Sequence, residues 1–346
     1  MCNIAGYVGK RDAAPIVIEM LRRQEGLDAG FYTGVVTYGN DHFHMCKTVG
    51  DMRTLEEKMQ GVSLDGNVGL AHSRTPGGGD DHWSHPFWGV KEGKNPRLAY
   101  VSNGTFGVFW DQIATITPIA DELMAQGYTL ETATNDFQWR LNLSSGESVH
   151  ITEVFTKQIC RNMDEGMDEL SALKAAFRVN GGEWVGLMLS EDHPDRVYFM
   201  RWNMPMFVAF SDHGAYMASC PIAFPEDAGE PVLLPAGSVG WISAEGYYAE
   251  PFSVEGRHLA PLDAEVRTKA YGAILDGLKK GEMTFPQMRE CLIPLFEKGL
   301  CAPGNALAYD ILSGLYKAGK VTMHVRELKG MKEGLLAPQC SFSLTI

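Results

Sequence analysis

The second residue of the chain, Cys2, is the first candidate for chemistry. If Met1 is removed, Cys2 carries both a thiol and a free α-amine. The reference pKa values of these groups are about 8.5 and about 7.7–8.0, so a partly neutral amine near pH 7 can take the thiol proton. A nucleophile paired with its own base in this way is typical of N-terminal nucleophile enzymes. The competing interpretation is a small buried thiol in an edge strand, because free cysteine is among the most buried residue types.

Hydrolysis of a carboxamide also needs donors for the oxyanion and an anchor for the substrate. Asn103 can offer a side-chain N–H and Gly104 a backbone N–H, and one such donor contributes about 3 kcal/mol. A plain hairpin turn is the alternative for an Asn-Gly pair. Arg74 has the planar fork that binds a carboxylate through two hydrogen bonds, with a surface salt bridge as the alternative. The glycine-rich residues 76–82 follow directly and predict either a mobile lid or a disordered surface loop.

The hydrophobic pattern predicts helices grouped around runs of strands, which favours an α+β fold over a βαβ repeat. Helices are expected at 13–23, 52–59, 119–126 and 152–179, and strands at 4–8, 34–38, 42–47, 68–72, 97–102, 184–189, 196–201, 206–210, 215–218 and 238–242. The strands stop around residues 247–251. Helices at 263–280, 285–298 and 306–318, and then a β-ribbon from 320–328, predict a small C-terminal module that resembles a winged helix.

Charge supports this division and limits the partners. The formal net charge is -13, which argues against non-specific binding of nucleic acid or an anionic membrane. Residues 250–346 hold twelve Lys and Arg against eleven Asp and Glu, a net of +1, so residues 1–249 carry -14. We therefore expect two units, residues 1–245 and residues 250–346, and protein contact rather than DNA binding for the second.

Cysteine use and hydropathy predict a cytoplasmic protein. The seven cysteines are dispersed without a CxxC pair, which is typical of free thiols in a reducing compartment. The start of the chain is too soon followed by charged residues to resemble a secretory signal. The longest apolar run, residues 204–210, contains a proline and is too short to span a bilayer.

Metal and cofactor signals are weak. His42, His44 and Cys46 alternate to one face of an expected strand, but no fourth ligand is near in sequence, so a half-exposed hairpin strand is the alternative. His82 and His85 have no assigned role. Neither a Walker A motif, a Rossmann fingerprint nor Gly-x-Ser-x-Gly is present. We expect no metal and no cofactor.

Short motifs in residues 1–245 together resemble the class II glutamine amidotransferases, and in particular the glutaminase domain of glucosamine-6-phosphate synthases. The order of the motifs carries the resemblance, because each motif alone is weak. They are Met-Cys-x-Ile-x-Gly-Tyr-Val-Gly at the start, Lys47-Thr48-Val49-Gly50, Gly69-Leu70-Ala71-His72-Ser73-Arg74-Thr75, Ser84-His85-Pro86, the strand from Leu98 to Gly104, Thr152-Glu153-Val154, Arg201 to Pro205, and Ala218-Ser219.

The resemblance implies a four-layer αββα sandwich of the N-terminal-nucleophile hydrolase type for residues 1–245. It implies that Cys2 hydrolyses glutamine to glutamate and ammonia, without a cofactor. Substrate-binding residues would be Arg74, His72, Thr75 and Glu153. Because roughly a hundred residues are too few for a sugar-isomerase domain, we expect the ammonia to pass to a partner synthase.

Several family positions are altered in this chain. Asn3, Ala29, Thr75 and Ser102 replace the usual Gly, Arg, Trp and His.

The most consequential change is Ile151, which stands where the family has the Asp that binds the glutamine ammonium. Glu147, His150 or Glu153 could substitute for that Asp. Two further readings therefore stay open: an N-terminal-nucleophile hydrolase for a different amide, and a catalytically silent binding module.

Overall fold

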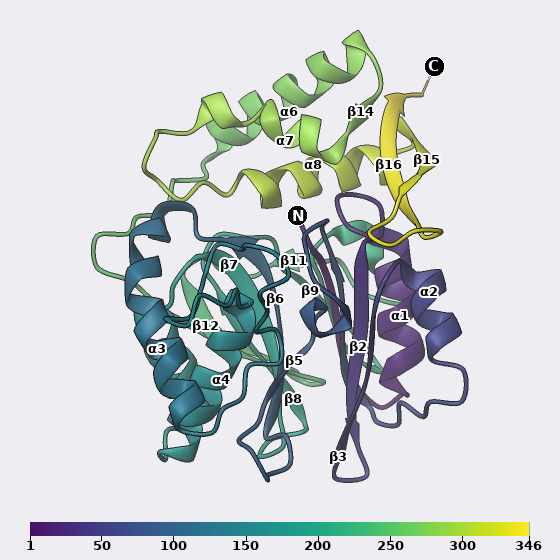
Figure 1. The fold of residues 1–346 in the computed structure, drawn as a ribbon. Helices are drawn as coiled ribbons and strands as arrows, with labels where there is room; N and C mark the ends of the chain where they lie inside the picture. The colour runs from purple at the N-terminus through teal and green to yellow at the C-terminus, as the bar shows by residue number, and fades with distance from the viewer. Residues whose placement is uncertain (346) are drawn as a thin grey trace.

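The computed structural model describes residues 1–345 and contains two large antiparallel sheets (Figure 1). The first sheet has the strand order β11-β9-β10-β1-β4-β2-β3. Its strands are β1 (Asn3–Gly9), β2 (Tyr32–Gly39), β3 (His42–Val49), β4 (Val68–Arg74), β9 (Phe207–Ser211), β10 (Gly214–Ala218) and β11 (Val232–Leu233). The second sheet has the order β13-β12-β8-β7-β6-β5. Its strands are β5 (Phe87–Gly89), β6 (Leu98–Thr105), β7 (Glu183–Ser190), β8 (Arg196–Arg201), β12 (Ser238–Ser243) and β13 (Gly246–Pro251).

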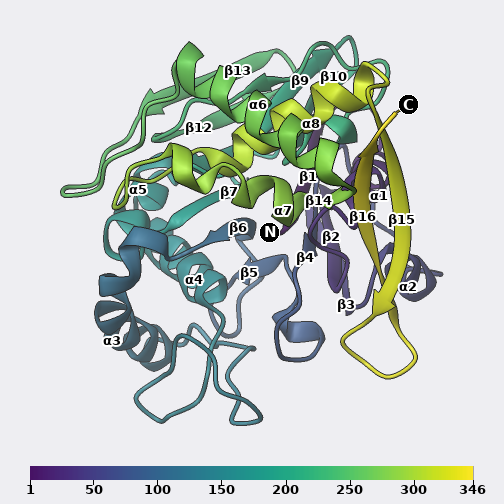
Figure 2. The ribbon, with the colours of Figure 1, turned by 90° about the horizontal axis from the view of Figure 1, so that it is seen from above.

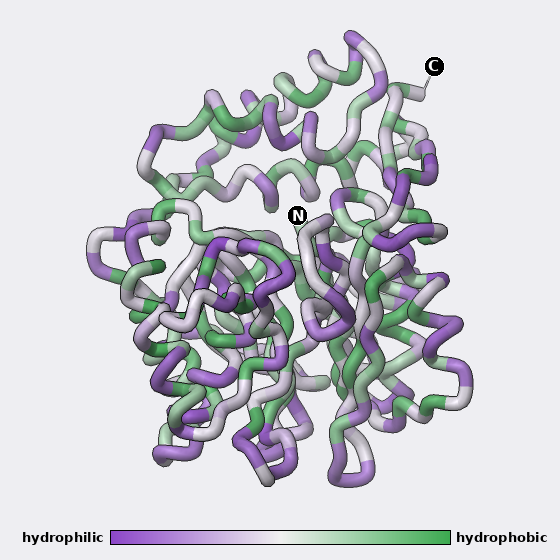
Figure 3. Tube along the Cα trace, in the orientation of Figure 1, coloured by the Kyte–Doolittle hydropathy of each residue, from purple (hydrophilic) through white to green (hydrophobic). Residues whose placement is uncertain are grey.

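Helices cover the outer face of each sheet, so the layers run helix, sheet, sheet, helix (Figures 1 and 2). The first sheet is covered by α1 (Ala13–Gln24) and α2 (Met52–Lys58), and the second by α3 (Ile113–Ala125), α4 (Ile151–Asp164) and α5 (Glu169–Val179). Ile4, Leu70 and Leu187 belong to the core between the two sheets. Figure 3 shows this apolar interior in green, with polar residues concentrated in the outer loops.

The strand β1 lies in the middle of its sheet, between β10 and β4. Its residues Ile4, Tyr7 and Val8 are buried on both faces, as a continuous apolar run predicts. The residue that precedes β1, Cys2, is thereby held at the edge of the core.

Three expected helices differ in extent. The helix expected at 119–126 begins earlier, because α3 spans Ile113–Ala125. The helix expected at 152–179 is two helices, α4 and α5, because Gly166 has a φ of 98° and Asp168 caps α5 by accepting a hydrogen bond from the Ser171 amide. The helix expected at 285–298 ends at Glu290. The strand β13 lies where the sequence predicted that strands stop.

The C-terminal residues form α6 (Ala264–Lys280), β14 (Met283–Thr284), α7 (Phe285–Glu290), α8 (Gly304–Lys317), β15 (Val321–Lys329) and β16 (Leu336–Leu344). Three helices followed by a β-ribbon is the order expected from the sequence, and the short β14 completes a small sheet of order β14-β16-β15.

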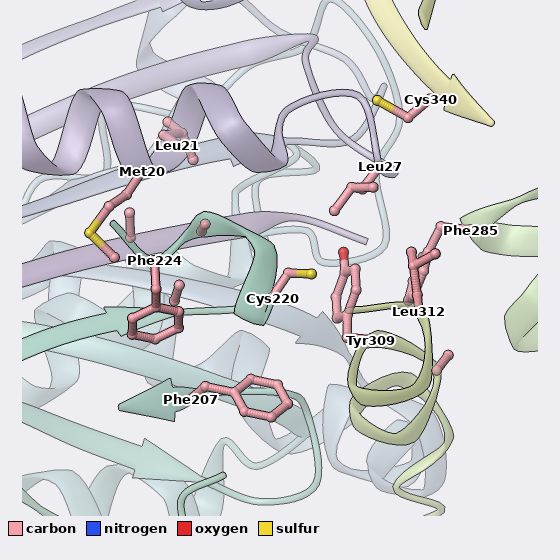
Figure 4. Close-up of a cluster of buried hydrophobic side chains, with 14 of the residues drawn as sticks. Met20, Leu21, Leu27, Phe207, Cys220, Phe224, Phe285, Tyr309, Leu312 and Cys340 are labelled. Carbon is pink, nitrogen blue, oxygen red and sulfur yellow. The ribbon is translucent and has the colours of Figure 1, made fainter. Parts of the chain in front are cut away.

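This C-terminal module packs on the sandwich and shares a core with it (Figure 4). Leu21 and Leu27, from the end of α1 and the loop after it, belong to the same buried cluster as Phe285 and Leu312 of the module. The two sequence units are therefore not separated by a layer of solvent. Within residues 1–345, no helix is long and apolar enough to cross a membrane.

Candidate active site

A cavity of about 960 Å³ surrounds Cys2. Its wall includes Asn103, Gly104, Arg74 and Thr75, which the sequence had placed in one site. The other side is closed by the roof segment, defined here as residues 289–305, which run from the end of α7 to the start of α8. Figure 1 shows the N-terminus directly beneath these helices.

Asn103 is oriented by the backbone of Cys2. The amide nitrogen of Cys2 donates a hydrogen bond of 3.0 Å to Oδ1 of Asn103. This contact leaves Nδ2 of Asn103 buried and without a partner among the described residues. Because buried amide groups are nearly always paired, an unpaired N–H at a cavity wall is suited to a ligand oxygen.

Gly104 lies within β6 and not in a hairpin turn. A Cβ atom at this position would lie 2.2 Å from the carbonyl oxygen of Glu183 on the neighbouring strand, so only glycine fits. The Asn-Gly pair thus presents its polar groups from a rigid strand, which is how a preorganised oxyanion site is built.

Arg74 is a buried cation that has no carboxylate partner among residues 1–345. Its guanidinium donates to the carbonyl of Trp83 at 3.1 Å and lies 4.6 Å from the ring centre of Tyr32. Burial lowers the pKa of Arg74 from its ordinary value. A buried charge is costly unless it is paired, so this site favours an anionic ligand over the surface salt bridge.

The glycine-rich loop packs against the aromatic residues around Arg74. A Cβ atom on Gly78 would lie 2.5 Å from the ring of Phe137, and one on Gly79 would lie 2.1 Å from Trp83. Close packing against these rings therefore explains two of the three glycines.

Comparisons with known proteins agree with this architecture. The glutamine–fructose-6-phosphate aminotransferase (isomerizing) of Chlorobaculum tepidum is 27% identical over 252 residues, which are 71% of this chain and 37% of that protein. The corresponding Pseudomonas aeruginosa protein is 25% identical over 295 residues, 84% of this chain and 42% of its own. The chain carries a class II glutamine amidotransferase domain. It spans less than half the length of these relatives, and no family model matches it.

The fold of the amidotransferase domain has solved counterparts. The glutamine phosphoribosylpyrophosphate amidotransferase of B. subtilis superposes with a TM-score of 0.58 over 80% of this chain and 58% of its own. The sequence identity is 18%, so this comparison concerns the fold alone.

Three histidines of the amidotransferase domain form a buried stack. The rings of His72 and His85 lie parallel with centres 3.9 Å apart, and His150 meets His85 edge-on at 5.1 Å. Nε2 of His72 donates to the carbonyl of Ser102 at 2.9 Å, and burial lowers the pKa of His72 to about 3. His85 and His150 line the cavity, whereas His72 does not.

The acidic side chains considered from the sequence lie elsewhere. Glu153 accepts hydrogen bonds from the amide and hydroxyl of Thr132, at 3.0 and 2.6 Å, and is not part of the cavity wall. Glu147 accepts from Ser145 within a turn. Ile151 does line the cavity, as the first residue of α4.

The unprocessed N-terminus is held in the cavity wall of the amidotransferase domain. The ammonium of Met1 forms an ion pair with Asp28, and the Met1 side chain is 4% exposed. Arg289 of the roof segment lies 3.7 Å from the same carboxylate.

Some cavity residues had no signal in the sequence. Trp184 comes from β7, while Arg289 comes from the roof segment and reaches the cavity only through tertiary packing. Among residues 1–345, no group of three His, Cys, Asp or Glu side chains is arranged to hold a metal ion. The ring of His44 instead contacts the carbonyl oxygen of Gly39 at 3.2 Å.

Proposed function

We propose that this amidotransferase domain hydrolyses the ω-amide of glutamine, or of a closely related carboxylate, with Cys2 as the nucleophile. Removal of Met1 gives Cys2 the α-amine that serves as its base. Arg74 binds the substrate carboxylate, and Asn103 and Gly104 stabilise the oxyanion. The single observation that supports the proposal is the contact between the Cys2 nitrogen and Oδ1 of Asn103, a side chain of the cavity wall whose Nδ2 has no partner among the described residues.

The reaction follows from this arrangement. The amine of Cys2 takes the thiol proton, and Sγ attacks the amide carbon. Asn103 and Gly104 donate hydrogen bonds to the oxyanion that forms. The amine then protonates the leaving nitrogen, the C–N bond breaks, and ammonia departs from a thioester. Water attacks the thioester carbon, the C–S bond breaks, and the carboxylate product leaves with the thiol restored.

The other cysteines provide an internal comparison. Burial raises the pKa of Cys160 and Cys220 to about 12 and that of Cys301 and Cys340 to about 11, so these thiols are poor nucleophiles near neutral pH. Cys291 is half-buried, as Cys2 is, and is the matched control.

The experiment is covalent labelling with a diazo-ketone analogue of glutamine, read by peptide mass spectrometry. We expect label on Cys2, an N-terminus that begins at Cys2, loss of ammonia release in Cys2→Ala, and unchanged release in Cys291→Ala. A retained Met1, or label on Cys291 with Cys2 unmodified, would overturn the proposal.

The fate of the ammonia is part of the same proposal. We propose that a partner synthase consumes it, because the matched relatives are aminotransferases that use glutamine. Amidotransferase activity that rises when a co-purified synthase and its acceptor are added supports this. Undiminished release of free ammonia in their presence contradicts it.

A further inference from the structure

The cavity wall around Cys2 is rich in N–H donors. Nδ2 of Asn103 and Nε1 of Trp184 are buried there and have no partner among the described residues. The guanidinium of Arg74 adds a positive charge without a carboxylate. Each of these groups requires an acceptor on a ligand or a water molecule.

Two histidines add donors to the same wall. Nδ1 of His150 accepts a hydrogen bond of 3.2 Å from the amide of Thr152, and Nδ1 of His85 accepts one of 3.2 Å from the amide of Ser102. A neutral imidazole has one donor nitrogen, so the hydrogen is on Nε2 of both rings. Burial lowers the pKa of both rings well below the ordinary value, which keeps them neutral.

The start of α4 has the same polarity. His150, Ile151 and Thr152 line the cavity at the N-terminus of this 14-residue helix. The dipole of a helix N-terminus favours an anion and disfavours a cation. The side chain of Ile151 cannot offset this preference, because it is apolar.

Few carboxylates reach the cavity to balance these donors. Glu183 accepts hydrogen bonds from the Val108 amide at 3.0 Å and from Nδ2 of Asn203 at 2.6 Å, so both of its oxygens are engaged. Glu297 is exposed on the roof segment. Asp28 is paired with the ammonium of Met1.

We propose that the site selects ω-amides of dicarboxylic acids whose second carbon carries no ammonium group, either unsubstituted or as a 2-oxo acid. This inference rests on the proposed function and specifies its substrate. The carboxylate binds Arg74, and the amide carbonyl meets Asn103. A 2-oxo oxygen accepts hydrogen bonds from the N–H groups of His150 and Trp184. An ammonium group has only donors, so it cannot accept a hydrogen bond from either side chain.

Asp28 provides the one rival arrangement. Once Met1 is removed, its carboxylate loses the ammonium partner and keeps Arg289 at 3.7 Å. If Asp28 then takes the ammonium of the substrate, glutamine is the better ligand. The two arrangements predict opposite orders of affinity.

The test compares L-glutamine with 5-amino-5-oxopentanoate, which is the same molecule without the ammonium group, and with its 2-oxo analogue. Binding to the full-length Cys2→Ala variant is measured by calorimetry, and turnover is measured with the unaltered chain. We expect both ammonium-free amides to bind at least tenfold more tightly, about 1.4 kcal/mol, and to have the higher kcat/KM. Preference for glutamine in binding overturns the inference.

Two substitutions sharpen the result. Ile151→Asp places a carboxylate at the start of α4 and is expected to shift the preference toward glutamine by tenfold or more. Val325→Asp, an exposed position outside the cavity wall, is the matched control and leaves the preference unchanged. Asp28→Asn is expected to leave it unchanged too, and a selective loss of glutamine affinity in that variant overturns the inference in favour of Asp28.

The inference and the proposed function fail in different ways. Binding to Cys2→Ala does not need the nucleophile, so the order of affinities tests the ligand class directly. Absence of turnover of all three amides, with Cys2 unlabelled, rejects the proposed function instead.

Discussion

Asn3 donates a hydrogen bond of 3.0 Å from its side-chain amide to the phenol oxygen of Tyr309, a residue 306 positions later in the chain. Both side chains are fully buried. The residue after the candidate nucleophile is thereby fixed by α8. Asn3 stands where the family has glycine, and its hydrogen-bond partner Tyr309 lies in the C-terminal module.

Tyr309→Phe is expected to weaken both stability and catalysis. The substitution removes the acceptor and leaves the buried amide of Asn3 unpaired, which costs about 1–3 kcal/mol. Urea unfolding should show this loss, and kcat should fall more than KM changes because Cys2 is less well positioned. Tyr316→Phe, on the exposed face of the same helix, is the control. Equal stability of the two variants would show that the contact is unimportant.

Ending the chain at residue 245 is expected to prevent stable folding of the amidotransferase domain. The truncation uncovers Leu21 and Leu27, which share a core with Phe285 and Leu312. Exposure of such apolar surface costs about 25 cal/mol per Å² and promotes aggregation. Thermal unfolding monitored by near-ultraviolet circular dichroism tests this, with the separate 250–346 fragment added to look for rescue. A cooperative transition near that of the full chain would establish residues 1–245 as independent.

Arg74→Lys is expected to raise KM for a carboxylate-bearing amide by tenfold or more. Lysine keeps the charge and loses the planar fork that binds a carboxylate through two hydrogen bonds. Steady-state kinetics measures the effect. Arg140→Lys is the control, since Arg140 lines the same cavity and donates to Thr105. An unchanged KM in Arg74→Lys would give Arg74 a structural role, holding the carbonyl of Trp83.

The buried histidines predict acid lability. The pKa of His72 is about 3 in the folded protein against an ordinary 6.5, and those of His85 and His150 are also lowered. Between about pH 6.5 and 3 the histidine ring binds a proton in the unfolded chain but stays neutral in the folded chain. The free energy of unfolding therefore decreases as the pH falls. His72 contributes about 1.4 kcal/mol per pH unit in that window and nothing above it, and the lowered pKa values of His85 and His150 act in the same direction below their ordinary value.

Urea unfolding at pH 5, 6, 7 and 8 measures this dependence. The unfolding free energy should fall steeply from pH 6 to 5, because the three histidines outweigh Glu25, whose buried carboxyl has a pKa raised to about 8 and acts in the opposite direction. His72→Gln should reduce the slope, while replacement of the exposed His42 by Gln should not. Equal stability at pH 5 and pH 7 would contradict the argument.

Much of the sandwich could be predicted because its strands are local signals. Continuous apolar runs bounded by glycine, such as β1, indicate buried strands whatever they pair with. The sequence predicted a ribbon but placed only its strand at 320–328, and its second strand, β16, contains Pro338, a residue that usually argues against a strand. Pro338 is tolerated because it pairs with Glu327 on one side, while β14 reaches only Ser341 and Phe342 on the other.

The candidate site could be predicted in part because some of its residues belong to short motifs, which are local signals in the sequence. Cys2, Arg74 and Asn103 belong to ordered motifs, and the structure brings them to one cavity. Glu153 also belongs to a motif, but its role depends on Thr132, a contact that no spacing rule indicates. Residues of the roof segment are joined to the site by packing alone.

The ion pair between Met1 and Asp28 has a consequence for how the protein is made. Where translation starts at Met1, β1 is made early but pairs with Gly214–Ala218 of β10 only later, and Asn3 meets Tyr309 later still. At about 5–20 residues per second, roughly 15–60 s pass before those partners exist. Within that interval an aminopeptidase meets Met1 before its ammonium is paired with Asp28, whereas in the folded chain the enzyme has to compete with that ion pair. The fraction of active molecules would then depend on the rate of Met1 removal relative to the rate of folding. Slower translation would increase that fraction.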